Sequence, residues 1–560
     1  MSGTMRGSGK PEIGYSQNGV PIPAEAPCDR LPRVALSGVA ESSPLMCLLT
    51  ARLAGLAQLR VRGGTVAPSA DWRRAVADTG LQWFDDVDRL EPREEVEDGL
   101  LVDLHAGGSG GSGRIWRVVG STGRGVLSPF FGLAECWRPS GNVPLSLIET
   151  TDGGTGWVML AEVRLSALQD YPVLLEGLAS AVANLIATAL GGNLAPSPWR
   201  PRARGRPTAW ARLGYHAAAH ARRLRNYATC ELWAIGVLDI RPDALLAGEK
   251  PRVSRWIEIP QSEGYVADPI PWPGRSDLIL CERFSHGTGR GSLQALTVQD
   301  GRIIDRLDVA LPVDCHLSYP FVWMDEGRIL CLPEMGASRR QLIYELSQDA
   351  PPRPVCTVAD NVVMADPTLF RSEGLYWIAY TDGDIGLYDN LCLLWAERLE
   401  GPWHPHRANP VKIDVRSSRG AGALFRSGER LIRPAQDCSR TYGGSVVLNR
   451  VLECTTTAYR EERVATVLPD PAGRFPDGLH TFSVCGDFVL IDGKRYVVDA
   501  GVLRQRVRSR LHRYLQRLPS RRLQARVESD RRPSPDPVPD RVPSGAVRQA
   551  TPGHRTGSPL

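Results

Sequence analysis

The second half of the chain repeats one hydrophobic pattern. An apolar run, a turn rich in Gly, Asp or Ser and a second apolar run follow one another in ADPIPWPGRSDLILCERF, HLSYPFVWMDEGRILCLPEM and ADPTLFRSEGLYWIAYTDG. Two short apolar runs joined by such a turn predict a β-hairpin. Fainter copies of the pattern begin at Ala421 and His480.

The spacing of these copies predicts the architecture. Five residues take the same place in successive copies, at steps of 51, 47, 55 and 59 residues: Asp268, Tyr319, Asp366, Ala421 and His480. A period of about fifty residues with a hairpin in each unit is typical of a β-propeller blade. We therefore predict a five-bladed β-propeller over residues 230–503.

The first half of the chain has a different pattern. PRVALSGV and AQLRVRGG are apolar enough for buried strands, and SSPLMCLLTARLAGL between them has the apolar spacing of a helix. A strand, a helix and a strand in this order predict a parallel sheet. A long helix is expected from about Asp170 to Leu190. Residues 32–195 are therefore predicted to form an α/β domain, which makes the chain a multidomain α/β plus all-β protein.

Three segments lie outside these two domains. Residues 1–31 are polar and rich in Gly and Pro, which predicts disorder. Residues 196–229 read as a basic linker that leads into a helix, and residues 504–560 as a basic helix followed by a disordered tail. Arginines beside leucines in the last helix are suited to an anionic membrane surface, whereas a solvated tail is the alternative.

Charge and cysteine content narrow the class of protein. The net charge of +5 over 560 residues comes largely from the two arginine-rich segments, so no nucleic-acid partner is expected. The twelve cysteines are scattered, with no CxxC, and many lie in apolar runs, where a thiol behaves as a small core residue. The N-terminus has no apolar signal region. These features predict a reduced, cytoplasmic setting.

Metal and cofactor signatures are weak in this sequence. His216 and His220 have the spacing of a metal-binding pair, but no glutamate or third ligand accompanies them. The glycine-rich segment AGGSGGSGR is not followed by the Lys-Ser/Thr of a phosphate-binding loop. We therefore predict neither a metal nor a cofactor.

The repeat also places the candidate chemistry. In a propeller the innermost strands converge on an axis, so equivalent positions of successive blades meet although they lie far apart in sequence. We expect Asp268, Asp366 and His480 to line one mouth of the axis. His316 and Tyr319 are supplied by the second copy. These five residues predict an axial polar site.

Cleavage of a glycosidic bond needs one protonated carboxylic acid and one carboxylate. Asp268 and Asp366 together with Glu282 or Glu334 would form such a set, because clustering and burial push carboxyl pKa values apart. The alternative is a purely structural role, in which an Asp before Pro begins a strand or binds turn amides. Three residues in a later polar region, Arg433, Gln436 and Asp437, are expected to bind sugar hydroxyls together with His316, Tyr319 and His480.

At these motifs the chain resembles a known family. ADP, HLSYPFVW, ADPTLF, GPWHPH and RPAQDC are similar to the propeller domain at the N-terminal end of plant glucosamine inositolphosphorylceramide transferase, also found in bacterial multidomain proteins. That domain is similar in fold to five-bladed arabinanases and furanosidases. The resemblance implies that Asp268 is a general base and Asp366 a second carboxylate, and it leaves the general acid open. In the plant protein glycosyl transfer is assigned to a separate C-terminal domain, so transferase activity is not carried over.

Residues 32–192 resemble the methionyl-tRNA formyltransferase fold through GVLSPFFG, TDGGTGWVML and the long helix. In bacterial proteins of the propeller family, such a domain often precedes the propeller. Formyl transfer needs an Asn and a His, oriented by an Asp. Pro129 and Phe130 stand near the expected Asn and His, and Gly154 near the Asp. The resemblance therefore implies a degenerate, inactive relative.

The leading hypothesis is a protein that binds a carbohydrate or glycolipid in polysaccharide or glycolipid biosynthesis. Whether it also processes this ligand is left open by the sequence. One alternative is a non-catalytic glycan-binding scaffold. The other is a formyl or one-carbon transferase that acts on an amino sugar.

Overall fold

The computed structural model describes residues 229–498 except 262, 348 and 349, together with parts of residues 14–201. The chain divides into two compact units, Met1–Asp499 and Ala500–Leu560. The second unit lies outside the described residues, as do the predicted basic helices, His216 and His220. Within the described part, no helix is both long and apolar enough to cross a membrane.

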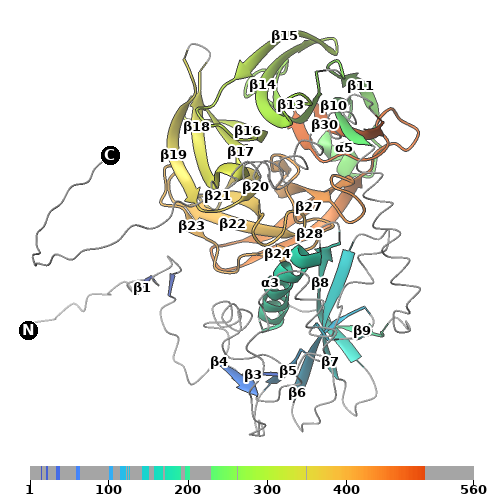
Figure 1. Cartoon of the computed structure of the whole chain (residues 1–560), viewed down its shortest axis with the longest axis vertical. Coiled ribbons are helices and arrows are strands. Elements are labelled where there is room, and N and C mark those ends of the chain that lie inside the picture. Colours follow the sequence, from blue (N-terminus) through green and yellow to red (C-terminus); the bar gives the residue numbers. More distant parts are fainter. Residues whose placement is uncertain are drawn as a thin grey trace, which may run out of the picture. The chain divides into compact units, whose positions relative to one another are not determined.

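Residues 230–497 form five antiparallel sheets, four with four strands and one with five, one sheet for each copy of the sequence repeat (Figure 1). Sheets I and II contain β12 (Tyr265–Pro271), β13 (Leu278–Ser285), β14 (Arg290–Gln299) and β15 (Arg302–Val309), then β16 (Ser318–Asp325), β17 (Arg328–Glu334), β18 (Arg340–Leu346) and β19 (Arg353–Asp360). Sheet III contains β20 (Met364–Ser372), β21 (Leu375–Asp382), β22 (Asn390–Ala396) and β23 (His404–Pro405), with β24 (Lys412–Ile413) also paired to β22. Sheet IV contains β25 (Phe425–Ser427), β26 (Arg430–Asp437), β27 (Ser445–Cys454) and β28 (Tyr459–Val467).

Sheet V joins the two ends of this region. It has the order β11 (Val253–Ile257), β10 (Cys230–Leu238), β30 (Phe488–Val497) and β29 (Phe482–Cys485). Strand β10 pairs with β30 along its full length. The first strands of neighbouring sheets also touch: β12 contacts β29 and β16, and β16 contacts β20. The mostly β architecture predicted from the repeat is therefore present, with one sheet for each copy.

Neighbouring sheets pack through apolar side chains. Leu330 and Ile343 of sheet II, for example, share one buried cluster with Ile378 of sheet III. Because both faces of the inner strands are covered, β13 and β17 read as continuous apolar runs rather than as alternating patterns. Two short helices interrupt the strands, α5 (Pro242–Leu246) and the 3-10 helix η2 (Gly336–Ser338). The cysteines described in the structure are all free thiols, and most of them are buried.

A seven-stranded mixed sheet precedes these five sheets. Its strands, in sheet order, are β4 (Gln58–Arg62), β3 (Arg33–Ser37), β5 (Leu100–Asp103), β6 (Arg114–Gly120), β7 (Asn142–Thr150), β8 (Trp157–Ser166) and β9 (Ser197–Trp199). The first four are parallel, as predicted, and the last three pairings are antiparallel. The predicted long helix is α3 (Tyr171–Leu190), which packs on β7 and β8. A two-residue pair, β1 (Gly14–Tyr15) with β2 (Pro21–Ile22), lies within residues 1–31.

The predicted formyltransferase likeness gains no support from this sheet. Parallel strands followed by a packed helix are common to many α/β domains, so they do not identify one family. The positions that would carry the chemistry, Pro129, Phe130 and Gly154, lie outside the described residues. The described residues form a mixed sheet with one long helix, and they do not support the predicted formyltransferase-like α/β domain.

Candidate functional site

Three of the repeat positions share an unusual backbone conformation. Asp268, Tyr319 and Asp366 have φ angles of 51°, 41° and 47°, in the left-handed region. Each sits at a bulge where the first strand of its sheet has one residue more than the second. A non-glycine residue held in a sparsely populated conformation costs about 1–3 kcal/mol, and such residues cluster at functional sites. Five other described residues have a positive φ, at turns and bends: Asp300, Glu326, Arg339, Asn361 and Glu373. The equivalence inferred from sequence spacing is thus also an equivalence of backbone geometry.

Each strained amide donates to a carboxylate of the neighbouring sheet. The Asp268 N–H donates to Asp492 Oδ2 at 3.1 Å, and the Tyr319 N–H to Asp268 Oδ2 at 3.0 Å. The Asp366 N–H donates to Glu334 Oε2 at 3.0 Å. These bonds link sheet V to sheet I, sheet I to sheet II and sheet II to sheet III. The carboxylates therefore have a structural task whatever else they do.

The four predicted catalytic acids interact electrostatically. Burial and the charges of Asp268 and Glu334 raise the pKa of Glu282 well above its usual value. Burial and Asp366 raise the pKa of Glu334 to about 8, although Arg419 acts in the opposite direction. Sequence reasoning therefore brought together acids that influence one another in the fold.

The pKa of Asp268 lies lower, at about 6. Burial raises it most, His480 lowers it, and Asp492 and Asp366 raise it again. Its carboxylate accepts hydrogen bonds from the Tyr319 N–H and from the Thr481 hydroxyl, the latter at 3.1 Å. At neutral pH the site thus combines an ionised Asp268 with a protonated Glu334.

Two side chains donate hydrogen bonds to Asp366. Arg419 lies in the segment before sheet IV, and Gln436 lies on β26 of that sheet. Arg419 Nε donates to Asp366 Oδ2 at 2.6 Å, and Gln436 Nε2 donates to the same oxygen at 2.8 Å. All three side chains are buried. Gln436 therefore joins the site, but through Asp366.

His316 faces Glu282. Its Nε2 lies 3.6 Å from Glu282 Oε1, while its Nδ1 accepts the Gly291 N–H at 2.8 Å. Because Nδ1 accepts, the ring proton is on Nε2 and points toward Glu282. Burial lowers the pKa of His316, which favours this neutral form. Only glycine fits at position 291, where a Cβ would lie 2.2 Å from Glu282 Oε1.

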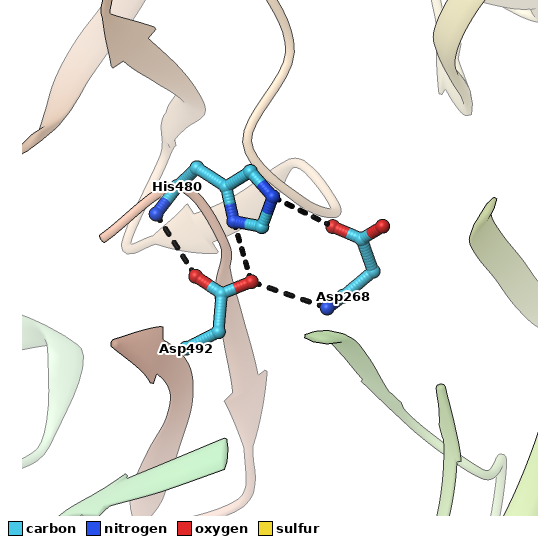
Figure 2. A group of neighbouring side chains, drawn as sticks. All are labelled: Asp268, His480 and Asp492. Atoms are coloured by element: carbon cyan, nitrogen blue, oxygen red, sulfur yellow. Dashed lines mark hydrogen bonds and ion pairs between the residues drawn. The ribbon is translucent and has the colours of Figure 1, made fainter. Parts of the chain in front are cut away.

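His480 contacts two carboxylates at once (Figure 2). Its Nδ1 lies 2.5 Å from Asp492 Oδ2, and its Nε2 lies 3.5 Å from Asp268 Oδ1. The side chain is only 4% exposed. The predicted role of His480 in binding sugar hydroxyls is therefore at odds with its position, because both ring nitrogens already face protein carboxylates.

Two other predicted sugar-binding residues have partners elsewhere. Arg433 makes a buried ion pair with Glu461, with Nε to Oε2 at 2.8 Å and Nη2 to Oε1 at 2.7 Å. Its Nη atoms also donate to the carbonyls of Ser417 and Ser418. Asp437 accepts the Ser439 N–H in a local turn. Arg433 and Asp437 therefore have structural partners within the protein, and their roles in binding sugar hydroxyls stay predictions. Tyr319 lies beside the acids, since its N–H donates to Asp268. Its hydroxyl is 2.7 Å from the Thr368 hydroxyl.

Sequence reasoning missed Arg419 and Asp492. Arg419 lies in the segment RSSRG, and its guanidinium lies over the Tyr442 ring at 5.0 Å from the centroid. Asp492 follows the apolar run FVLI, as Glu282 follows DLILC and Glu334 follows ILCLP. That shared pattern, an acid at the end of the second apolar run, was the signal that would have found Asp492.

Asp268, His480 and Asp492 are also residue types that bind metal ions, and one ligand atom of each lies within 4.8 Å of the others. Their oxygens are already engaged. Asp492 Oδ1 accepts the N–H groups of His480 and Thr481, both at 2.9 Å, and its Oδ2 accepts the Asp268 N–H. A cation would have to displace these donors, so the geometry is accounted for without one.

Comparison with solved structures gives low-scoring matches to glycoside hydrolases. A thermostable family-43 glycoside hydrolase is 13% identical, covers 35% of this chain and 74% of its own, and has a TM-score of 0.27. Zg3597, a family 117 glycoside hydrolase produced by Zobellia galactanivorans, is 12% identical, covers 43% and 89%, and has a TM-score of 0.29.

Sequence relatives are more informative. Glucosamine inositolphosphorylceramide transferase 1 of Oryza sativa subsp. japonica is 29% identical over 254 residues, which is 41% of this chain and 34% of the relative. The Arabidopsis thaliana protein of the same name is 29% identical over 263 residues, 43% of this chain and 34% of the relative. The chain thus spans about a third of the length of these relatives.

The family profile described as "Glucosamine inositolphosphorylceramide transferase 1, N-terminal" matches residues 257–474. The match begins well after residue 192, so it lends nothing to the formyltransferase likeness of the first half. It includes Asp268, Glu282, Glu334 and Asp366. The part of the chain that carries the four candidate acids is therefore similar to the N-terminal region of glucosamine inositolphosphorylceramide transferase 1.

Proposed function

We propose that sheets I–V form a five-bladed propeller that binds a carbohydrate, or the sugar headgroup of a glycolipid, and performs acid–base chemistry on a glycosidic bond. One observation carries this proposal. Carboxyl groups from three successive sheets act on one another, two of them (Asp268 and Asp366) at strained backbone positions, and their environments separate their pKa values. Two carboxyl groups in different protonation states are what glycosidic cleavage requires.

The name of the relatives supports the proposed substrate class. It gives glucosamine inositolphosphorylceramide, a sphingolipid whose headgroup contains a sugar, and the matched region holds the acids. A glycan or glycolipid headgroup of this kind is the proposed substrate of the present chain. Transfer by the whole relative is not assigned to it, because the matched region is about a third of that protein.

Glu334 is the better general acid of the two glutamates left open by the sequence. Its pKa of about 8 keeps it protonated at neutral pH, and its side chain is 19% exposed, against 8% for Glu282. Glu334 would give its proton to the departing sugar oxygen. Asp268 would take one proton from the attacking water or hydroxyl, so the reaction leaves no net change in protons. Asp366, fixed by Arg419 and Gln436, would hold Glu334 in place through its N–H.

A non-catalytic glycan-binding role is the second candidate. It is favoured by the hydrogen bonds that Asp268 and Asp366 already accept from protein groups, since a saturated carboxylate is a poorer base. In that case the acids would maintain the fold around a bound sugar.

A two-stage experiment separates these candidates. A glycan array with the full chain identifies a ligand, and turnover of that ligand is then followed for the wild type, Glu334→Gln and Asp268→Asn. We expect turnover to fall by about 10²–10⁴-fold in both variants while ligand affinity is retained. Asp325→Asn, which alters a carboxylate at the far end of β16, is the matched control. Wild-type turnover by Asp268→Asn contradicts the proposed base, and binding without turnover by the wild type establishes the second candidate.

A further inference from the structure

His480 lies in a line of three buried side chains that ends at Asp268. Asp492 comes from β30, His480 from the segment before β29, and Asp268 from β12 (Figure 2). The two ring nitrogens of His480 face the two carboxylates, at 2.5 Å from Asp492 and 3.5 Å from Asp268. This is an Asp–His–Asp line that joins sheet V to sheet I.

With both neighbours ionised, a protonated imidazole presents an N–H to each carboxylate. A neutral ring has one N–H donor and one lone pair, and the lone pair would then face a carboxylate. The two acids are buried, with Asp492 fully inaccessible to solvent, so an imidazolium between them also supplies the opposite charge that buried carboxylates need. Burial alone would lower the pKa of His480, but Asp492 and Asp268 raise it above its usual value.

The ring of His480 is fixed in orientation. It stacks on Trp233 with ring centroids 4.0 Å apart and an interplanar angle of 23°, and it meets the edge of Tyr442 at 5.2 Å. Gly443 lies against it, where a Cβ would be 2.7 Å from His480 Cβ. With these contacts the imidazole cannot turn away from either carboxylate without disturbing its packing.

Several titratable groups surround His480. Asp492 on β30, Asp268 on β12 and Asp366 on β20 all favour the charged ring. The Tyr442 hydroxyl is buried and its pKa is raised, so it stays neutral. Lys494 lies across the Trp233 ring, 5.3 Å from its centroid, and burial lowers its pKa. Arg419 lies over the same Tyr442 ring and pairs with Asp366. With these groups in place, the carboxylates raise the pKa of His480.

The geometry points to a positioning role: Asp492 and protonated His480 orient Asp268 and keep it ionised, so that Asp268 can act as a base in an otherwise buried acid cluster. This inference rests on the proposed function for its catalytic consequence, but the ion triad itself does not. His480 holds its proton throughout, and only Asp268 gains and loses one. Asp492 acts through His480 and through its bond to the Asp268 N–H.

The first test needs no activity. The full chain is labelled with ¹³Cε1-histidine, the His480 signal is identified by its loss in His480→Gln, and its pKa is measured by NMR titration. We expect His480 to remain protonated above its ordinary range and its pKa to fall by about 1–3 units in Asp492→Asn. An ordinary or lowered pKa in the wild type overturns the inference. A signal that changes on addition of EDTA would assign the three side chains to a metal ion and would also overturn it.

The second test uses the pH profile of turnover. Because His480 lowers the pKa of Asp268, His480→Gln should move the acidic limb of the profile to higher pH, by about 1–3 units. His406→Gln is the matched control, since His406 is equally buried but its ring contacts backbone groups. An unmoved limb contradicts the positioning role. If no glycan is turned over, the proposed chemistry fails, while the NMR titration still decides on the triad.

Discussion

Arg419 and Asp366 form a buried ion pair, with Arg419 Nε 2.6 Å from Asp366 Oδ2. The guanidinium also reaches within 3.9 Å of Glu334 Oε2 and lies over the ring of Tyr442. One cation therefore serves two carboxyl groups of the candidate site. Without it, Asp366 would be an uncompensated charge away from water.

Arg419→Met should consequently destabilise the protein. Removing one partner of a buried ion pair costs about 3–5 kcal/mol, because the remaining charge stays buried. Urea unfolding followed by tryptophan fluorescence measures the change. Arg416→Met is the matched control, since Arg416 pairs with Asp414 at a half-exposed position. An equal decrease in the free energy of unfolding in the two variants would show that the buried Arg419–Asp366 pair stabilises the fold no more than the half-exposed pair.

A second buried cluster should govern the stability of sheet IV in acid. Glu461 contacts Arg433 and Lys412, each at 2.7 Å, and Glu461 and Arg433 are both 2% exposed. Burial alone would raise the pKa of Glu461, but the two cations lower it to about 2. A depressed carboxylate pKa contributes stability above its unfolded value, near 4.5, and that contribution is lost as the pH falls toward 2.

Glu461→Gln should therefore unfold more easily than the wild type at pH 7, by about 3 kcal/mol, and the difference should shrink below pH 4. Guanidinium unfolding at pH 3, 5 and 7 provides the measurement. The neighbouring Glu462, which is half exposed in its pair with Arg450, supplies the control variant Glu462→Gln. A difference that does not depend on pH would mean that the lost contacts are steric rather than ionic.

Glu334 should behave in the opposite way. Its pKa is raised to about 8, so between about pH 4.5 and 8 the unfolded chain gives up this proton and the folded chain retains it. The folded protein therefore loses stability as the pH rises through this range. Glu334→Gln keeps an oxygen for the Asp366 N–H and removes the ionisable group.

We expect Glu334→Gln to be more stable than the wild type at pH 7.5, on the order of 1–3 kcal/mol, and equal to it near pH 4. Thermal unfolding at the two pH values tests this. A loss of stability at pH 7.5 would show that Glu334 is needed for the fold in its charged form, which would remove it as the general acid.

The sequence predicted the position of this site better than the contacts within it. Asp268, Tyr319 and Asp366 were grouped by spacing alone, and they share a bulge and a left-handed φ, because a repeated strand start is a local feature written in each copy. The fourth copy is offset: the left-handed residue is Gly422, next to the predicted Ala421.

Partner choice was beyond the sequence for a physical reason. Arg433 suited a sugar as well as a carboxylate, and its partner Glu461 lies on another strand 28 residues further on, so residue type could not decide between them. The long helix α3 and the parallel strands of the first sheet were predictable from periodicity. Their assignment to one fold family was not, since periodicity specifies elements and leaves ancestry open.

The pH dependence of turnover tests which carboxyl group acts as the general base and which as the general acid. With Asp268 as the base, activity should rise as the pH passes about 6, and with Glu334 as the acid it should fall as the pH passes about 8. The profile should be bell-shaped, and its limbs are properties of the interacting cluster rather than of single residues. Glu282→Gln should keep both limbs of the pH–rate profile and most of the activity, because Glu282 is the more buried glutamate and His316 already faces it.

Glu334→Gln should abolish the alkaline limb of the profile along with most of the rate. Rate profiles of the two glutamine variants from pH 4 to 10 decide the matter: loss of activity and of the alkaline limb in Glu282→Gln alone would transfer the acid role to Glu282.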